Sequence, residues 1–489
     1  MLKLTHTKLN QTKISFLAIP VCEDADIHEY GTIQELVKKA GCFQEFQGKK
    51  DQELELNCPD ETGFQRVMCM GVGKLNVLDA EIFRKMAGKA VRSAIKKKMA
   101  DVVIVLPAVG KIPVDMPDLI TAVSEGACLG NDVFDLYKSE KKIRPLDRIH
   151  LWAASEVVND FQRLPSRIES VCEGTLTARR WVSMPPNEKK PEAFTRTIVT
   201  EAEKAGLQVT VLDEKQLQKD GFGGIMAVSS GSLSHPRMVV LDYCPEHAGQ
   251  TVVLVGKGVT FDAGGINLKP STSLEDMKMD MAGAAAVAAT LITLARTGCR
   301  HRVIGVLPIV ENMPSGNASC PGDIIRTYNG KTVEIGNTDA EGRLILADAM
   351  AYAVEHCQPA VLIDAATLTG ACVTALGEQI AGVFSPDDNL AQQVCQSGEK
   401  TNERCWRMPL PDDYRVLLKS DFADINNMSR SRWGGAITAA LFLSEFVGNV
   451  RWAHIDIAGP AYAKKESTYC GAGGTGFGVR LLWDVVQQL

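Results

Sequence analysis

Two acids and an arginine alternate in one short stretch of the sequence, GNTDAEGRL, at residues 336–344. Asp339, Glu341 and Arg343 stand there between a strand-like run and a helix-like run. A salt-bridged surface turn would explain the pattern if it stood alone. Carboxylates are also ligands for divalent cations, so the stretch gains chemical meaning if the fold brings other charged residues beside it.

Two lysines and two further acids follow another strand-like run, TVVLV at 251–255. Lys257 and Asp262 lie in the glycine-rich GKGVTFDAGG, Lys269 follows shortly after it, and Asp280 opens a predicted helix. In open α/β sheets, ligands bind beyond the carboxyl ends of the strands. These residues are therefore expected to meet those of GNTDAEGRL on adjoining elements.

The predicted cluster holds more negative than positive charge. Carboxylates packed closely repel one another and raise one another's pKa values. Divalent cations would remove that repulsion, and two cations that share carboxylates form a familiar hydrolytic centre. A structural network of ion pairs is the alternative that the residues leave open. The acids are Asp262, Asp280, Asp339 and Glu341, and the lysines are Lys257 and Lys269.

Other catalytic motifs are missing from the sequence. It contains no phosphate-binding G-x-x-x-x-G-K-[ST] loop, no H-E-x-x-H zinc motif and no G-x-S-x-G nucleophile elbow. None of the eight histidines lies in the charged stretches. A histidine-ligated zinc and a histidine base are therefore disfavoured, and His454 in WAHIDIAG is predicted to be a satisfied core residue.

The elements that must position these residues alternate between strand-like and helix-like patterns. In the first part of the chain, apolar runs at 15–22, 101–109 and 148–155 alternate with helical patterns such as 80–98. The second part holds strand candidates that read as continuous apolar runs, mostly separated by helical patterns, which predicts parallel pairing. These candidates are 208–212, 237–241, 251–255, 302–308, 332–335, 360–364 and 452–457.

We therefore expect an α/β protein with two domains. Residues 1–160 are predicted to form a smaller N-terminal α/β domain. Residues 185–489 are predicted to form a C-terminal catalytic domain with a mixed, mostly parallel twisted sheet flanked by helices. The connecting segment 161–184 is predicted to be helical, because the helix-breaking MPPNEKKP begins at its end.

The composition disfavours several classes of partner. Fifty-three basic and fifty-nine acidic residues give a net charge of −6, which argues against nucleic acid or an anionic membrane as the main partner. The longest nearly apolar run, 281–295, is shorter than the roughly 18 to 20 residues of a membrane span, so a buried helix is predicted. The N-terminus lacks a signal-peptide pattern, and the fourteen scattered cysteines are expected to be reduced core residues. A cytoplasmic location is the resulting expectation.

These motifs resemble those of the M17 leucyl aminopeptidases, a family of dimetal cytosolic exopeptidases. GNTDAEGRL is close to the family signature N-T-D-A-E-G-R-L. The resemblance spans the second half of the chain, whereas the first 160 residues show no such signature and correspond to the part that varies in the family. The other matching stretches are VGKGVTFDAGGINLKP, MKMDMAGAA, DAATLTGA, WRMPL, DFADIN, GAITAALFL, WAHIDIAG and GSLSHPRMVVLDY.

The resemblance implies a role for each charged residue of the cluster. Asp262 and Glu341 would bridge two divalent metal ions, and Lys257 would be a ligand in its neutral form. Lys269 and Arg343 would be the catalytic residues that are not ligands. Zinc or manganese is the expected metal, with magnesium and cobalt as alternatives. The implied ligands are Lys257, Asp262, Asp280, Asp339 and Glu341.

The implied reaction removes the N-terminal residue from a peptide that has a free amine. Water held between two divalent ions would attack the scissile carbonyl, and Lys269 would stabilise the oxyanion as an ammonium donor. Arg343 stays protonated and cannot serve as a base, but its guanidinium can hold an anion. The resemblance supplies bicarbonate at this arginine as the general base.

The resemblance also implies an apolar pocket and an assembly. Leucine or another apolar N-terminal residue is the expected preference, although Ala461 stands near the place where many relatives carry a bulkier methionine. Relatives are hexamers, so a homohexamer is expected. A dipeptidase such as a cysteinylglycine hydrolase is one alternative, and a DNA-binding accessory protein, which the acidic charge disfavours, is another. The implied pocket residues are Met277, Asn337, Thr367, Leu368, Thr369 and Gly370.

Overall fold

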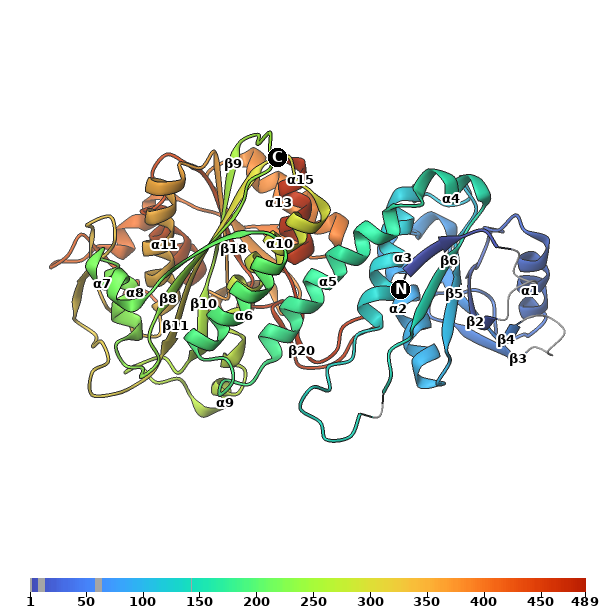
Figure 1. Ribbon diagram of the computed structural model, residues 1–489, viewed down its shortest axis with the longest axis horizontal. Helices are drawn as coiled ribbons and strands as arrows, with labels where there is room; N and C mark the ends of the chain where they lie inside the picture. Colours follow the sequence, from blue (N-terminus) through green and yellow to red (C-terminus); the bar gives the residue numbers. More distant parts are fainter. Residues whose placement is uncertain (1, 8–13, 58–63, 142) are drawn as a thin grey trace. The chain divides into compact units, whose positions relative to one another are not determined.

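The structure is a computed structural model that describes residues 2–7, 14–57, 64–141 and 143–489. The chain divides into two compact units. Each unit contains its own sheet and helices, so the prediction of a two-domain α/β protein is confirmed (Figure 1). The helix α5, Leu164–Ser183, begins in unit 1 and ends in unit 2. Unit 1 comprises residues 1–172 and 465–471, and unit 2 comprises residues 173–464 and 472–489.

Unit 1 is built on a six-stranded sheet in which β3 pairs antiparallel and the other strands pair parallel. The three predicted strands form β2, β5 and β6, and the predicted helix forms α2. The strands in sheet order are β1 (Leu2–Thr5), β6 (Arg148–Trp152), β5 (Asp101–Val105), β2 (Ile14–Cys22), β4 (Phe64–Gly73) and β3 (Glu53–Asn57). The helices are α1 (Gly31–Gly41), α2 (Ala80–Lys96), α3 (Met116–Gly130) and α4 (Ser155–Phe161), followed by the first part of α5.

A short segment near the end of the chain, residues 465–471, belongs to unit 1. The hydroxyl of Tyr469 donates a hydrogen bond to Glu81 of α2 over 3.0 Å. Gly88 of α2 faces the same segment, because a Cβ atom there would lie only 2.8 Å from the Cβ of Tyr469. The late segment therefore packs as a part of the N-terminal unit, which no sequence pattern indicated.

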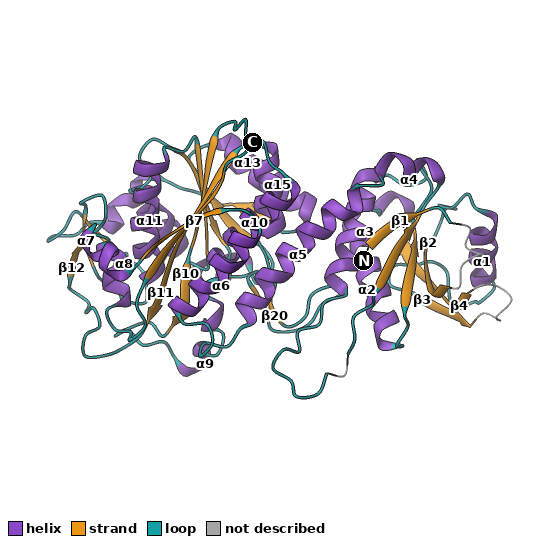
Figure 2. Ribbon diagram, in the orientation of Figure 1, coloured by secondary structure: helices purple, strands orange, loops and turns teal. Residues whose placement is uncertain are grey.

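Unit 2 is built on a nine-stranded mixed sheet whose central strands run parallel (Figure 2). All of the predicted strands except 332–335 lie in this sheet. In sheet order the strands are β16 (Cys405–Arg407), β15 (Ala381–Phe384), β18 (Arg451–Asp456), β14 (Val361–Ala366), β9 (Thr251–Gly256), β11 (Arg302–Asn312), β8 (Arg237–Tyr243) and β7 (Gln208–Leu212), and β10 (Gly258–Asp262) also pairs with β11.

The remaining predicted strand, β13 (Thr332–Glu334), lies in a separate three-stranded sheet. It pairs antiparallel with β12 (Ile324–Arg326) and parallel with β17 (Ile425–Asn426). The expectation that this strand belongs to the main sheet is therefore wrong. A tight turn causes the difference, because the Thr327 N–H donates to the carbonyl of Lys331 and folds β13 back onto β12.

Helices cover both faces of the main sheet and enclose two apolar cores. Strand β9 supplies both cores because its side chains alternate. Val252 and Leu254 face one core, whereas Val253 and Val255 face the other. Burial of each such side chain stabilises the fold by roughly 1.5–3 kcal/mol. The first core is covered by α6 (Pro191–Lys204), α10 (Ala282–Thr297), α13 (Asp388–Thr401) and α15 (Val479–Gln488), and the second by α8 (Gly223–Ser229), α11 (Glu341–Cys357) and α14 (Gly435–Ser444).

The start of α10 approaches the sheet very closely. A Cβ atom at Gly283 would lie 2.0 Å from the carbonyl oxygen of Ala365 in β14, so only glycine fits there. The Lys257 N–H donates to the same carbonyl over 3.1 Å, and the carbonyl of Lys257 accepts from the Ala284 N–H over 2.8 Å. The segment that precedes α10 is thereby held at the carboxyl ends of β9 and β14.

Two predictions from composition, a buried helix at 281–295 and cysteines that all lie in the core, have different outcomes. The prediction of a buried helix at 281–295 is confirmed by α10. Among the described helices, one segment at Met277–Thr297 is long and apolar enough to cross a membrane, and 83% of its apolar window is buried inside the protein. The expectation that all cysteines are core residues is wrong, because Cys42, Cys244 and Cys320 are exposed.

Candidate metal centre

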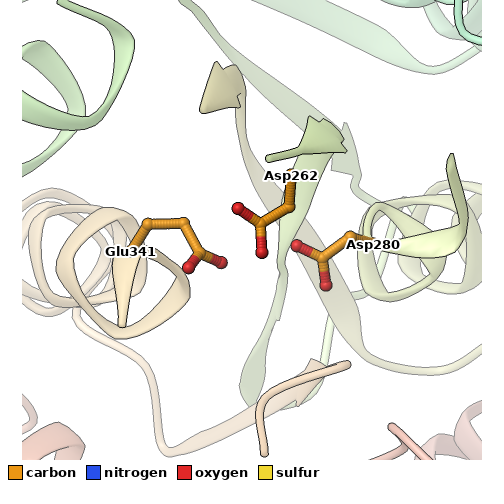
Figure 3. Close-up of side chains that lie close together, drawn as sticks. All are labelled: Asp262, Asp280 and Glu341. Atoms are coloured by element: carbon orange, nitrogen blue, oxygen red, sulfur yellow. The ribbon is translucent and has the colours of Figure 1, made fainter. Parts of the chain in front are cut away.

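Three carboxylates from separate elements meet at one point of unit 2 (Figure 3). Asp262 ends β10, Asp280 follows the short 3-10 helix η4 (Met277–Met279), and Glu341 begins α11. One oxygen of each residue lies within 4.8 Å of the others, and all three residues are buried. Such a group of buried carboxylate oxygens is able to hold a divalent cation.

Two lysines lie among these acids. The Lys257 ammonium nitrogen is 2.8 Å from an oxygen of Asp280 and 2.8 Å from an oxygen of Glu341. The Lys269 nitrogen is 2.8 Å from Asp262 and 2.6 Å from Asp339. The structure therefore brings together all four predicted acids and both predicted lysines.

The pKa values in the cluster reflect both burial and neighbouring charges, and although burial would raise the pKa of Glu341, Lys257 and Lys269 lower it. Burial and the charge of Glu341 raise the pKa of Asp262 to about 6, despite the nearby lysines. Burial likewise raises the pKa of Asp280 well above its usual range. Although burial alone would lower the pKa of Lys257, the charges of Asp280 and Glu341 raise it. The cluster thus has a surplus of negative charge, which positive ions would neutralise.

One carboxylate oxygen of Asp280 is not satisfied by the described residues. Its Oδ1 atom accepts a hydrogen bond from the Thr367 hydroxyl over 2.7 Å and contacts Lys257. Its Oδ2 atom is buried and has no hydrogen-bond partner among the described residues. An unpaired buried carboxylate oxygen is costly unless a cation or another donor binds it. The residues present therefore fit a metal site.

Asn312, at the end of β11, orients Asp262. Its Nδ2 atom donates to the Oδ1 atom of Asp262 over 2.8 Å and to the carbonyl of Thr338 over 3.1 Å. The backbone N–H of Gly264 donates to the same Asp262 oxygen over 2.9 Å. Sequence reasoning missed Asn312, because its contacts join two segments that are distant along the chain.

Asn427 fixes the GNTDAEGR loop from the other side. Its Oδ1 atom accepts from the N–H groups of Gly336 and Asn337, and its Nδ2 atom donates to the carbonyls of Asn337 and Ala340. The side chain is fully buried. It thereby determines the path of the loop that carries Asp339 and leads into Glu341. The matching stretch DFADIN ends at the residue before Asn427, so the only sign in the sequence was that a recognised motif lies next to it.

Arg343 lies in the first turn of α11 and is buried. It donates one hydrogen bond, over 2.7 Å, to the carbonyl of Asn427. Its Nε atom has no hydrogen-bond partner in the described part of the chain. Burial lowers the pKa of Arg343 to about 10, which leaves the guanidinium charged at neutral pH. A charged buried donor of this kind fits a small anion.

The predicted pocket residues lie on three segments near the acids. Met277 begins η4 and is partly buried, and the Asn337 side chain accepts from the Asp339 N–H over 2.8 Å. The carbonyl of Thr367 accepts from the Lys257 ammonium group over 2.8 Å. Thr369 caps α12 (Gly370–Leu376) by accepting from the Cys372 N–H. Leu368 lies in the β14–α12 connection, and Gly370 is the first residue of α12.

His454 is fully buried in β18, which confirms its predicted place in the core. Its Nδ1 atom lies 2.6 Å from Asp364, which also accepts from the Trp452 indole over 2.8 Å. Burial alone would lower the pKa of His454, but the nearby Asp364 carboxylate raises it by more, so the net shift is upward. The expectation of a satisfied side chain is only half correct, because Nε2 has no partner among the described residues.

Comparison with known proteins gives a consistent result. Residues 176–483 match the cytosol aminopeptidase family, catalytic domain, and residues 23–141 match its N-terminal domain. The first 160 residues therefore do carry a family signal, although no motif in them was recognised. A probable cytosol aminopeptidase of Chlorobium phaeobacteroides is 39% identical over 502 residues, covering 99% of both chains. One of Rhodococcus jostii is 41% identical and covers 90% of this chain and 86% of its own.

Two solved structures are also similar. The bottromycin maturation enzyme BotP in complex with Mn is 37% identical, with a TM-score of 0.86 over 97% of this chain and 99% of its own. A mutant of tomato leucine aminopeptidase is 30% identical, with a TM-score of 0.89 over 100% of this chain and 96% of its own. The resemblance inferred from the motifs is confirmed. The chain belongs to the cytosol aminopeptidase family, and this membership identifies it as a metal-dependent aminopeptidase.

Proposed function

We propose that the protein is a dimetal aminopeptidase that removes leucine or another apolar residue from the N-terminus of peptides. The observation that carries this proposal is the buried cluster of Asp262, Asp280 and Glu341, with oxygens within 4.8 Å of one another and a surplus of negative charge. A structural ion-pair network would instead be balanced in charge and would leave no buried carboxylate oxygen without a partner.

The residues that would hold two divalent ions are Lys257, Asp262, Asp280, Asp339 and Glu341. By resemblance to the family, Asp262 and Glu341 would each help to hold both ions. When bound, two divalent ions supply Lewis acidity and lower the pKa of water. Lys257 would serve as a neutral ligand, since added positive charge beside its nitrogen lowers its pKa.

Lys269 would donate to the oxyanion that develops on the scissile carbonyl. Burial opposes its protonation, but the surrounding carboxylates raise its pKa, so it stays an ammonium group. Its side chain is 15% exposed, which leaves it accessible to a substrate. A preorganised donor of this kind contributes roughly 3 to 4 kcal/mol to transition-state stabilisation.

Arg343 would hold bicarbonate as the general base. The guanidinium itself cannot accept a proton, and its Nε atom lacks a partner among the described residues. A bound anion would satisfy that donor and would place a proton acceptor beside the carboxylate cluster. If this is correct, turnover will be lost in carbonate-free buffer and restored by added bicarbonate.

The substrate pocket would be lined by Met277, Asn337 and the segment Thr367–Gly370. The uncharged character of these side chains supports a preference for leucine and similar residues. Zinc or manganese would be the metal, with magnesium or cobalt as alternatives, and the manganese complex of BotP supports manganese. A homohexamer in the cytoplasm is proposed by family resemblance, and light scattering after size-exclusion chromatography would test the assembly.

The deciding experiment uses leucine p-nitroanilide and its N-acetylated form with metal-stripped protein, to which zinc or manganese is returned. Metal-dependent cleavage of the free-amine substrate alone is expected. Cleavage of the acetylated substrate, or activity without metal, would contradict the proposal. Turnover that falls as peptides lengthen beyond two residues would instead favour a dipeptidase that acts on substrates such as cysteinylglycine.

A further inference from the structure

Lys189 is a fully buried lysine that lies outside the carboxylate cluster. It lies between α5 and α6, two residues before α6 begins, and its side chain has no exposed surface. Its ammonium group donates three hydrogen bonds, all to backbone carbonyls. These carbonyls belong to Trp181 at 2.9 Å, Val182 at 2.9 Å and Lys278 at 2.6 Å.

The sequence explains two of these hydrogen bonds. Trp181 and Val182 lie in the last turn of α5, where each carbonyl would accept from the backbone N–H four residues later. Those positions are Pro185 and Pro186, which have no N–H to donate. Lys189 therefore supplies the two donors that the prolines remove.

The third hydrogen bond reaches a different part of unit 2. Lys278 is the middle residue of η4, between Met277 and Met279, and Asp280 follows directly. Asp280 points into the carboxylate cluster, and its own carbonyl accepts from the Val259 N–H over 3.3 Å. One ammonium group thus links the end of α5 to the turn that carries both a proposed pocket residue and a proposed metal ligand.

Stability alone does not account for a charge in this place. No ion pair among the described residues involves Lys189, and burial together with the charge of Lys278 lowers its pKa well below the usual value. An uncompensated buried ammonium group is costly to desolvate, and carbonyl acceptors offset only part of that cost. An apolar side chain of similar length would avoid the cost but would leave the Lys278 carbonyl of η4 without this donor.

We propose that Lys189 is a positioning residue that sets the place of η4, and through it both the side-chain selectivity of the pocket and the metal affinity of the Asp280 site. This inference rests on the proposed function. A shift of η4 would move Met277 and Asp280 together. Removal of the ammonium group should therefore change two properties that a merely stabilising residue would leave alone.

The test compares Lys189→Met with the matched control Lys204→Met, which changes an exposed lysine on α6 that pairs with Glu201. Wild-type protein is assayed first with leucine and alanine p-nitroanilides. An inactive wild type would refute the proposed function, whereas the inference on Lys189 is judged only on the differences between the variants.

Lys189→Met is expected to fold with a melting temperature within about 4 °C of that of the control. Three functional results are then expected. The ratio of kcat/KM for leucine over alanine falls roughly tenfold, the size of effect that pocket contacts produce. Manganese binds roughly 10-fold more weakly in calorimetry, as for other residues that orient ligands. Amide hydrogen exchange becomes faster in the metal-free protein at 276–280 and not in α11. If this variant keeps the leucine-to-alanine selectivity, the manganese affinity and the amide hydrogen exchange of the wild type, the proposal is overturned.

A double-mutant cycle with Met277→Ala separates positioning from a general effect. If Lys189 acts through η4, the two substitutions will have non-additive effects on the leucine-to-alanine ratio. Additive effects would overturn the proposal. Lys189→Gln serves as a second variant, because its amide can donate two hydrogen bonds but not three. Failure of both Lys189 variants to fold would also overturn it, since Lys189 would then be a general determinant of the fold.

Discussion

Each unit of the protein contains a buried charged cluster, and the two clusters differ in their balance. In unit 1, the buried Arg84 pairs with Glu125 over 2.6 Å and also with Glu81, and the exposed Lys85 lies 3.6 Å from Glu81. With the exposed Lys85 included, two bases meet two acids among these pairs. In unit 2, two lysines meet four acids at the candidate metal centre.

The difference shows that burial of charge does not by itself indicate a functional site. Arginine keeps its charge and forms fixed pairs with carboxylates, which suits a permanent structural contact. Lysine changes its pKa readily with its surroundings, which suits a site that exchanges protons or cations. A surplus of acid, together with an Asp280 oxygen that has no hydrogen-bond partner among the described residues, distinguishes the site that needs a ligand.

Replacement of Asp280 by Asn should show the difference between the two charged clusters most strongly. Divalent ions contribute several kcal/mol to transition-state stabilisation, so peptidase activity should fall by roughly a thousandfold or more. The melting temperature of the metal-stripped protein should stay equal or rise, because burial raises the pKa of this acid and its ionised form opposes folding. Calorimetry with manganese and thermal denaturation give the two readouts. Retained activity with a lower melting temperature would indicate a structural network instead.

Replacement of Glu125 by Gln should have the opposite outcome in unit 1. Loss of one partner leaves the buried Arg84 charge partly uncompensated, which costs about 3–5 kcal/mol of folding stability. The kcat/KM per folded molecule should not change. Urea denaturation measures the cost, and Glu55→Gln is the control because its pair with Arg66 is half exposed and contributes at most about 1 kcal/mol.

Lys269→Met should separate the two lysines of the metal centre. Lys269 donates to the substrate in the proposed mechanism, so kcat should fall roughly 10²–10³-fold while manganese binding is retained. Lys257→Met should instead weaken manganese binding, because it removes a proposed ligand. Equal loss of metal affinity in both variants would show that the two lysines do not have distinct functions.

Asp348 should give the smallest effect, because it is a single buried acid that forms no ion pair with any residue that the structure describes. It lies in α11 and accepts from the N–H groups of Ile225 and Tyr328 over 2.9 and 2.8 Å, and burial raises its pKa to about 7. The folded state therefore binds the proton more tightly than the unfolded state, where the pKa is about 3.9. Stability should fall as the pH rises from about 4 to 7 and level off above that.

The variant Asp348→Asn tests this pH dependence. Melting temperatures from pH 4 to pH 8 should decline less steeply in the variant than in the wild type, because the titrating group is gone. The acids of the metal centre still titrate in both proteins, so the difference between the two curves isolates Asp348. Parallel curves would contradict the assigned pKa shift.

Much of the fold was predictable because it depends on local patterns. Predicted strands such as 251–255 and 360–364 form central strands of the main sheet, whose alternate side chains enter two cores. The charged stretches also converge as expected, since parallel strands bring their carboxyl ends together. The place of β13 was not predictable, because a three-residue strand is directed by a turn and a distant partner.

The residues that support the site were the hardest to predict. Asn312, Asn427 and Lys189 act through hydrogen bonds to backbone groups far away along the chain. Such bonds leave no periodic pattern and no characteristic spacing in a single sequence. Only the missing donors at Pro185 and Pro186 gave a local sign that another group must serve the end of α5.

The late segment 465–471 has a consequence for the order in which the protein is made. It contributes Tyr469 to unit 1, yet it follows every strand of the nine-stranded sheet along the chain. On the ribosome, unit 1 is the first to emerge, but it lacks this segment until the main sheet of unit 2 has been synthesised. The N-terminal unit therefore emerges first but is completed only after the main sheet of unit 2 has been synthesised, and α15 then completes unit 2. A nascent chain that stalls before residue 465 would leave both units unfinished.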